Sequence, residues 1–124
     1  RLTPRIVEEL HLEGGSLLRT GRGNPLHEEM AKTFHREGVS QVYIIGGVGS
    51  HTGALQIFEA AQGLGIDLGI CAIPKTIDND MALLDFTFGH NTAVSEAKRA
   101  IDAACKEARG SRDCVGLVKL MGSH

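Results

Sequence analysis

Apolar side chains fall into two patterns along this chain, one typical of buried strands and one typical of helices. Residues 41–45 and 68–73 are short runs that are almost wholly apolar, as in strands covered on both faces of a parallel sheet. Between them, residues 54–61 carry apolar side chains at spacings of three and four, which predicts a helix. The pattern therefore predicts a βαβ unit over residues 41–73.

Three more helices are predicted around this unit. A capping residue followed by proline opens a helix at residues 3–4, with Ile6 and Leu10 on its buried side. The same signal recurs at residues 24–25 and opens a second helix. An apolar stripe over residues 91–110, closed by a glycine, predicts the last helix.

Two extended segments and one long connection complete the pattern. Residues 16–18 are a brief extended piece, and the apolar residues 114–120 predict the last strand. Pro74 is expected to end the strand before it, because proline cannot donate a ladder hydrogen bond. Residues 74–88 then form a connection without periodicity, and connections of that length are usually functional or disordered.

Composition excludes several classes of protein. The 13 basic and 15 acidic residues are interspersed, with a formal charge of −2, so no polybasic surface for nucleic acid is expected. The apolar runs are too short to span a bilayer, and the start of the chain does not resemble a signal peptide. The three cysteines form no C-x-x-C pair, which favours free thiols in a reducing compartment. The six histidines lack zinc-ligand spacing.

The long connection begins with two carboxylates two residues apart. In an extended segment such residues point the same way, so Asp78 and Asp80 can face one pocket, one as a proton acceptor and the other towards a metal ion. Carboxylates this close repel, and Lys75 or a bound magnesium ion would offset that repulsion. The alternative is a polar turn whose side chains cap local backbone groups.

A glycine-rich segment, residues 46–50, follows the first strand of the βαβ unit and precedes its helix. Glycines allow close approach of the backbone to a phosphate, and a helix N-terminus presents free N–H groups. A tight turn that needs positive φ is the alternative. A dinucleotide fold is only weakly indicated, because Asp67 precedes the second strand rather than following it.

Ligands of open parallel sheets gather at the carboxyl ends of the strands, and three segments are expected there. These are residues 46–50, 74–80 and 121–124. Arg19 and Arg22 lie on a further loop, where an arginine can neutralise charge on a transferred phosphoryl group or simply remain solvated.

Four motifs, in this order and spacing, resemble the phosphofructokinase family. They are Gly46-Gly47-x-Gly49-Ser50, Pro74-Lys75-Thr76-Ile77-Asp78-Asn79-Asp80, Phe88-Gly89-x-x-Thr92-Ala93-Val94 and Val118-Lys119-Leu120-Met121-Gly122. The similarity is closer to the long plant and protist type, because Lys75 precedes T-I-D-N-D. The resemblance implies an α/β fold, a Rossmann-like three-layer sandwich with a mainly parallel sheet, present here as a single partial domain over residues 1–124.

The resemblance also implies a reaction, the transfer of the γ-phosphoryl group of ATP to the 1-hydroxyl of fructose 6-phosphate with Mg²⁺. Asp78 would be the general base, and Thr76 would contact the sugar near the reacting oxygen. Asp80 would help to hold the metal and phosphates, and Arg22 would stabilise the transferred group. The donor phosphates would contact Gly46, Gly47, Gly49 and Ser50, and the sugar site would be edged by Met121 and Gly122.

Three departures from the family pattern keep alternatives open. Val48 stands where the family has an aspartate that binds magnesium, and Ser123 stands where an arginine is expected. The chain is also expected to lack the N-terminal glycine loop and the residues that grip the sugar 6-phosphate. A non-catalytic regulatory or ligand-sensing subunit is therefore the first alternative.

A pyrophosphate-dependent enzyme is the second alternative. Gly49 favours ATP, because the family's pyrophosphate users carry aspartate there, whereas Lys75 occurs in both groups. We expect a cytoplasmic protein that is a homo-oligomer in its full-length form.

Overall fold

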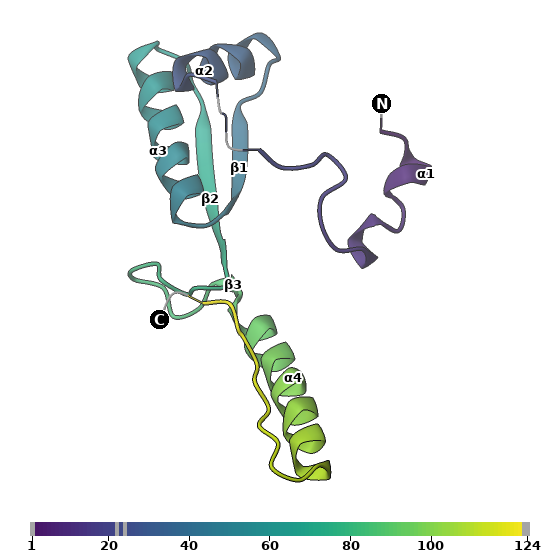
Figure 1. The fold of residues 1–124 in the computed structure, drawn as a ribbon. Helices are drawn as coiled ribbons and strands as arrows, with labels where there is room; N and C mark the ends of the chain where they lie inside the picture. The colour runs from purple at the N-terminus through teal and green to yellow at the C-terminus, as the bar shows by residue number, and fades with distance from the viewer. Residues whose placement is uncertain (1, 22, 24, 123–124) are drawn as a thin grey trace.

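The structure, a computed structural model, describes residues 2–21, 23 and 25–122. The described part contains three parallel strands in the order β1-β2-β3, together with helices, which confirms the α/β class (Figure 1). The elements are α1 (Pro4–Val7), η1 (Leu10–Leu12), α2 (His27–Arg36), β1 (Gln41–Gly46), α3 (Val48–Gly63), β2 (Gly69–Thr76), β3 (Phe88–Gly89) and α4 (His90–Gly110).

The predicted βαβ unit is confirmed. Strands β1 and β2 pair in parallel from Gln41 opposite Gly69 to Gly46 opposite Pro74, and α3 connects them. Helices α2 and α3 pack against each other, and α3 packs on the two strands. The buried cluster between them consists of Ala31, Ile57, Ala61, Ile66 and Leu68.

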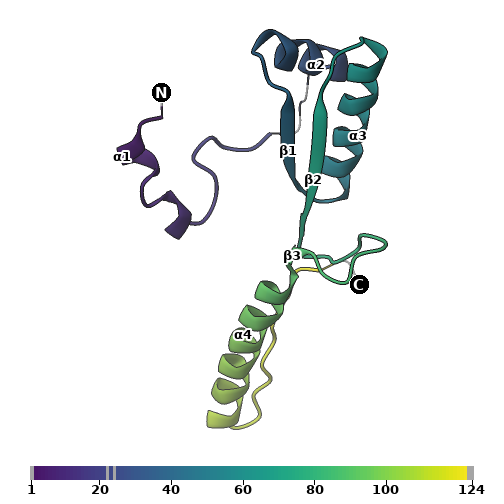
Figure 2. The same cartoon turned by 180° about the vertical axis from the view of Figure 1, so that it is seen from behind.

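The expectation that β1 is covered on both faces is wrong for the described part of the chain. Tyr43 and Ile45 are each 62% exposed, whereas Val42 and Ile44 pack against the core. Figure 2 shows β1 and β2 with no helix in front of them. Because residues of a strand alternate between faces, the outward residues of β1 remain open when the helices lie behind it.

Strand β2 continues past Pro74, so the prediction that proline ends it is wrong. Pro74 lies opposite Gly46, the last residue of β1. Beyond it, Lys75 and Thr76 pair with the two-residue strand β3, which was not predicted. Proline is accommodated here because it sits where β2 changes neighbours, at the end of one hydrogen-bonded ladder.

The N-terminal predictions hold only in part. Helix α1 begins at Pro4 as expected but has four residues and no buried side chain, and Ile6 is 49% exposed. Residues 16–18 form a turn instead of an extended piece, with the Arg19 amide 3.1 Å from the Ser16 carbonyl. A longer helix would have to be stabilised by packing against other elements, and α1 lies away from the sheet (Figure 1).

The start of the second helix also differs from its prediction. Helix α2 begins at His27 with Leu26 as its N-cap, so the helix starts after the proline signal at residues 24–25. Asn24, which was expected to cap it, lies outside the described residues.

The prediction of a last strand over residues 114–120 is wrong. Helix α4 forms as expected, and residues 114–122 run back along it without strand pairing (Figure 1). Gly116 lies close to α4, since a Cβ on Gly116 would be 2.9 Å from the Ala104 carbonyl oxygen. A helix uses its own backbone hydrogen bonds internally and therefore offers an extended segment no ladder partner.

Candidate functional site

The glycine-rich segment and the aspartate segment lie at the same edge of the sheet. Strands β1 and β2 are parallel, and Gly46 lies opposite Pro74. A Cβ placed on Gly47 would lie 3.8 Å from the Thr76 Cβ and 3.9 Å from the Lys75 carbonyl oxygen. The parallel pairing therefore brings the two carboxyl-terminal segments into contact.

The glycine-rich segment is mostly helix and not loop. Helix α3 begins at Val48, with Gly47 as an extended N-cap at φ −83° and ψ −168°. The amides of Ser50 and His51 bond to the Gly47 carbonyl at 3.0 and 3.1 Å. The amides of Val48 and Gly49 precede Ser50, the first residue whose amide donates to the Gly47 carbonyl, so both are available to an anion.

Close packing, and not positive φ, accounts for the glycine at the end of β1. Neither Gly46 nor Gly47 nor Gly49 adopts a positive φ, so the turn alternative is not supported. A Cβ on Gly46 would instead overlap the Ser50 side chain. The first turn of α3 therefore folds back tightly over the end of β1.

The threonine after Lys75 holds Asp78 by a local hydrogen-bond pattern. The Asp78 amide donates to the Thr76 hydroxyl oxygen at 3.1 Å, and that hydroxyl donates to Asp78 Oδ2 at 3.4 Å. Asp78 is partly buried. Thr76 therefore fixes both the backbone and one carboxylate oxygen of the predicted base.

The expectation that Asp78 and Asp80 face one pocket from an extended segment is wrong. Asn79 between them has φ +53°, which turns the chain. Asp78 lines a groove, whereas Asp80 is exposed and does not line it. The polar-turn alternative holds for Asn79, whose Oδ1 accepts a 2.8 Å hydrogen bond from the Thr87 amide.

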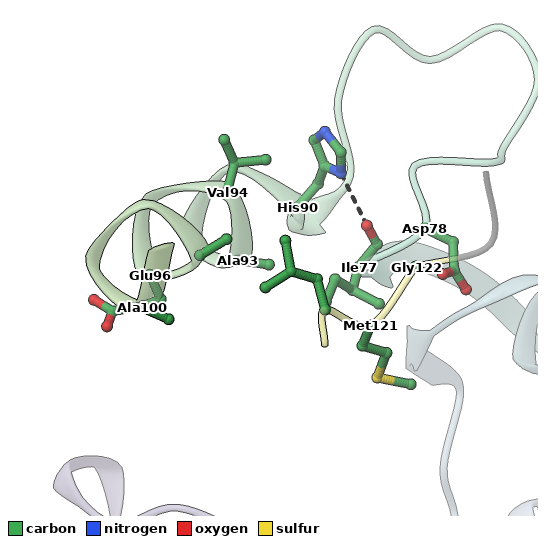
Figure 3. A pocket seen from close by; sticks show the side chains of 11 residues that line it. Ile77, Asp78, His90, Ala93, Val94, Glu96, Ala100, Met121 and Gly122 are labelled. Carbon is green, nitrogen blue, oxygen red and sulfur yellow. Dashed lines mark hydrogen bonds between the residues drawn. The ribbon is translucent and has the colours of Figure 1, made fainter. Parts of the chain in front are cut away.

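The groove beside Asp78 has a volume of about 380 Å³ and runs between the end of β2, α4 and the C-terminal segment. Figure 3 shows Asp78 and Gly122 on one side of it and Ala93 and Val94 on the other. Met121 also lines it, so the structure brings three of the predicted substrate residues together. The full lining is Ile77, Asp78, His90, Ala93, Val94, Glu96, Ala97, Ala100, Leu120, Met121 and Gly122.

His90 is a site residue that sequence reasoning missed. It is the first residue of α4, and its Nδ1 lies 2.8 Å from the Ile77 carbonyl oxygen, next to Asp78 (Figure 3). His90 stands at an unspecified position of the Phe88-Gly89-x-x-Thr92 motif, so the family resemblance did not select it. Histidine spacing alone gave no reason to select it.

Several predicted residues do not join this groove. Arg22 and Ser123 lie outside the described residues. Lys75 is exposed on β2 instead of on a loop, and Val48 is 50% exposed at the start of α3. Cys71, Cys105 and Cys114 are free, as predicted, and all three are exposed.

At this edge of the sheet, the protein's oxygen ligands suit a magnesium ion that is also bound by phosphates. The described residues contain no group of three or more His, Cys, Asp or Glu side chains that could hold a metal ion. Mg²⁺ characteristically takes one or two carboxylates and fills its remaining positions with water and substrate phosphates. The exposed Asp80 carboxylate fits that donor set, whereas Val48 offers no side-chain oxygen.

The profile of the family described as Phosphofructokinase matches residues 1–124. The chain belongs to the phosphofructokinase family. It is 45% identical over 123 residues to ATP-dependent 6-phosphofructokinase 4, chloroplastic, of Arabidopsis thaliana, covering 99% of this chain and 23% of that protein. It is 46% identical over 123 residues to ATP-dependent 6-phosphofructokinase of Trypanoplasma borreli, covering 99% of this chain and 25% of that protein.

This phosphofructokinase-family chain thus spans about a quarter of the length of the curated relatives that it matches. Its fold also resembles the crystal structure of pyrophosphate-dependent phosphofructokinase from Marinobacter aquaeolei, with a TM-score of 0.70. That likeness covers 86% of this chain and 28% of the other at 20% sequence identity, so it shows the fold alone. The Rossmann-like α/β class is confirmed as a partial domain.

Helices of the described residues give no candidate for a membrane span, because none combines the necessary length and apolar character.

Proposed function

We propose that this chain is part of a 6-phosphofructokinase that transfers the γ-phosphoryl group of ATP to the 1-hydroxyl of fructose 6-phosphate. The observation that supports the proposal is the closeness of Gly47 to Thr76, because it brings the start of α3, with its free amides, near the groove that Asp78 lines. Residues 1–124 form part of one domain, and the rest of the full-length protein completes both substrate sites.

Asp78 acts as the general base in this proposal. Thr76 engages its Oδ2, and Oδ1 has no hydrogen-bond partner among the described residues. Oδ1 accepts the proton of the sugar 1-hydroxyl while the bond from that oxygen to the γ-phosphorus forms. The bond from the γ-phosphorus to the bridging oxygen breaks, and ADP leaves with that electron pair.

The donor phosphates bind at the start of α3. The free amides of Val48 and Gly49 and the Ser50 side chain face the phosphates, and the helix dipole favours their negative charge. Arg22 neutralises charge on the transferred group. When bound, magnesium supplies further charge neutralisation between the phosphates, with Asp80 as a protein ligand.

The sugar is bordered in this groove by Met121 and Gly122. Both line the same groove as Asp78, and its apolar wall comes from α4. An apolar wall with few polar groups is the usual way in which a pocket excludes water and orients a ligand.

A non-catalytic subunit is the second candidate, and Val48 is the observation that favours it. Valine at the first position of α3 is 50% exposed, and its side chain offers no ligand to a hard cation. A protein that keeps the anion site but lacks this metal contact would bind ATP without transferring phosphate.

The test is a turnover assay on the full-length protein with magnesium, fructose 6-phosphate and either ATP or pyrophosphate. Formation of fructose 1,6-bisphosphate with ATP supports the proposal. Turnover with pyrophosphate alone assigns the other donor, and ATP binding without product supports the non-catalytic subunit. Sedimentation and cell fractionation of the same protein test the proposed homo-oligomer and the proposed cytoplasmic location.

A further inference from the structure

The peptide unit between Ile77 and Asp78 is held at both of its ends. Its carbonyl oxygen, on Ile77, lies 2.8 Å from His90 Nδ1 (Figure 3). Its N–H, on Asp78, donates to the Thr76 hydroxyl oxygen at 3.1 Å. Because a peptide unit is planar, fixing its oxygen and its nitrogen fixes the plane in which the Asp78 Cα lies, and so the point from which that side chain leaves the backbone.

We propose that His90 is a positioning residue for Asp78, acting through this peptide unit; the inference rests on the proposed function of Asp78. His90 reaches the backbone, and within the described part of the chain it makes no hydrogen bond to the Asp78 carboxylate. It therefore orients the base without exchanging a proton with it.

The hydrogen bond fixes the protonation of one ring nitrogen. A carbonyl oxygen only accepts, so Nδ1 carries hydrogen in the neutral ring and also in the imidazolium ion. The positioning contact therefore persists whether or not the ring is charged. The other titratable side chains that line the groove are Asp78 and Glu96.

The surrounding loop supports a positioning role. Thr87, only 4% exposed, donates from its hydroxyl to the Thr76 carbonyl at 2.8 Å and from its amide to Asn79 Oδ1 at 2.8 Å. The residues on both sides of the Ile77–Asp78 peptide are thus anchored as well. His90 supplies the anchor that comes from α4, the helix that forms the far wall of the groove.

The experiment compares three variants of the full-length protein, His90→Leu, His90→Asn and His27→Leu. Leucine removes the donor at similar volume, whereas asparagine carries an N–H donor at the same branch position as Nδ1. His27 is the matched control, because it is the first residue of α2 and is also partly buried.

We expect His90→Leu to lower kcat by about tenfold with KM for ATP unchanged, as for the loss of one hydrogen bond at a reacting group. His90→Asn should recover most of this loss, and His27→Leu should match the wild type. The ratio of wild-type to His90→Leu kcat should stay constant from about pH 6 to about pH 8, whereas a proton-transferring histidine would change it.

Hydrogen exchange separates this inference from the proposed function. In His90→Leu the amide exchange of residues 77–80 should rise while that of β1 stays unchanged, even if the wild-type protein has no turnover. Unchanged exchange at residues 77–80, or a His90→Asn variant as impaired as His90→Leu, would overturn the positioning role. Absence of wild-type turnover with a normal exchange response would instead refute the kinase proposal alone.

Discussion

The Thr87 hydroxyl donates a 2.8 Å hydrogen bond to the backbone carbonyl of Thr76, eleven residues earlier in the chain. This contact closes the loop that carries Asp78 and Asp80. Because Thr87 is 4% exposed, its hydroxyl has little access to water as an alternative partner. The loop is therefore held at its base by a side chain that does not line the groove.

Replacing Thr87 by valine should loosen this loop. The change removes the hydroxyl but keeps the shape, and leaves the Thr76 carbonyl without this partner, at a cost of about 1–3 kcal/mol. Limited proteolysis within residues 77–87 should become faster. Thr87→Ser retains the donor and serves as the control; equal cleavage rates in both variants would show that the hydroxyl does not anchor the loop.

Replacing Asp78 by asparagine should abolish phosphoryl transfer and spare ligand binding. Asparagine keeps the shape and an acceptor for the Thr76 hydroxyl but cannot take the sugar proton. We expect kcat to fall by about 100- to 10,000-fold, the range of general acid–base contributions, with ATP affinity unchanged by calorimetry.

The matched control for this variant is Asp85→Asn. Asp85 lies in the same loop, and its backbone carbonyl accepts a 3.4 Å hydrogen bond from the Asn79 side chain, a contact that the substitution leaves in place. Turnover that survives in Asp78→Asn would remove Asp78 from the role of base.

Replacing Val48 by aspartate should raise turnover if the site lacks only this magnesium contact. Val48 is half exposed at the first position of α3, where an acidic residue also suits the helix dipole. A metal contact contributes several kcal/mol to a transferring phosphoryl group, so kcat at limiting magnesium should rise by about tenfold or more. Val48→Asn is the uncharged control. No gain in Val48→Asp, with ATP still bound, would favour the non-catalytic subunit.

Replacing Gly46 by alanine should destabilise the fold. The new methyl group would overlap the Ser50 side chain, and overpacking of this kind costs about 1–3 kcal/mol. The melting temperature should fall, and Gly46→Ala combined with Ser50→Gly should recover part of the loss. Gly53→Ala is the control, since a Cβ there has open space within α3. A melting temperature that falls in Gly53→Ala but not in Gly46→Ala would contradict the packing argument.

Local patterns predicted those elements whose formation depends on neighbours in the sequence. The apolar runs of β1 and β2 and the spacings in α3 and α4 are each visible within one segment, and all four elements formed. The extension of β2 past Pro74 was not predictable in this way, because it depends on β3, more than ten residues further on. Residues 114–120 have the composition of a strand but lie against α4, where no ladder partner exists.

In the candidate site, too, some features follow from the local sequence and others depend on contacts between distant segments. The sequence selected Thr76, Asp78 and the glycines as candidates, through their motifs and their order along the chain. The turn at Asn79, which separates Asp80 from the groove, depends on a hydrogen bond with Thr87. The contact of His90 with Ile77 joins residues 13 positions apart.

By itself, the sequence determined the alternation of strands and helices, the family resemblance and the chemical groups at the strand ends. Tertiary structure alone decided which of these groups share a groove and which backbone groups hold them. The physical reason is that periodicity and residue type act within a few positions, whereas orientation is fixed by hydrogen bonds and packing between segments that the sequence separates.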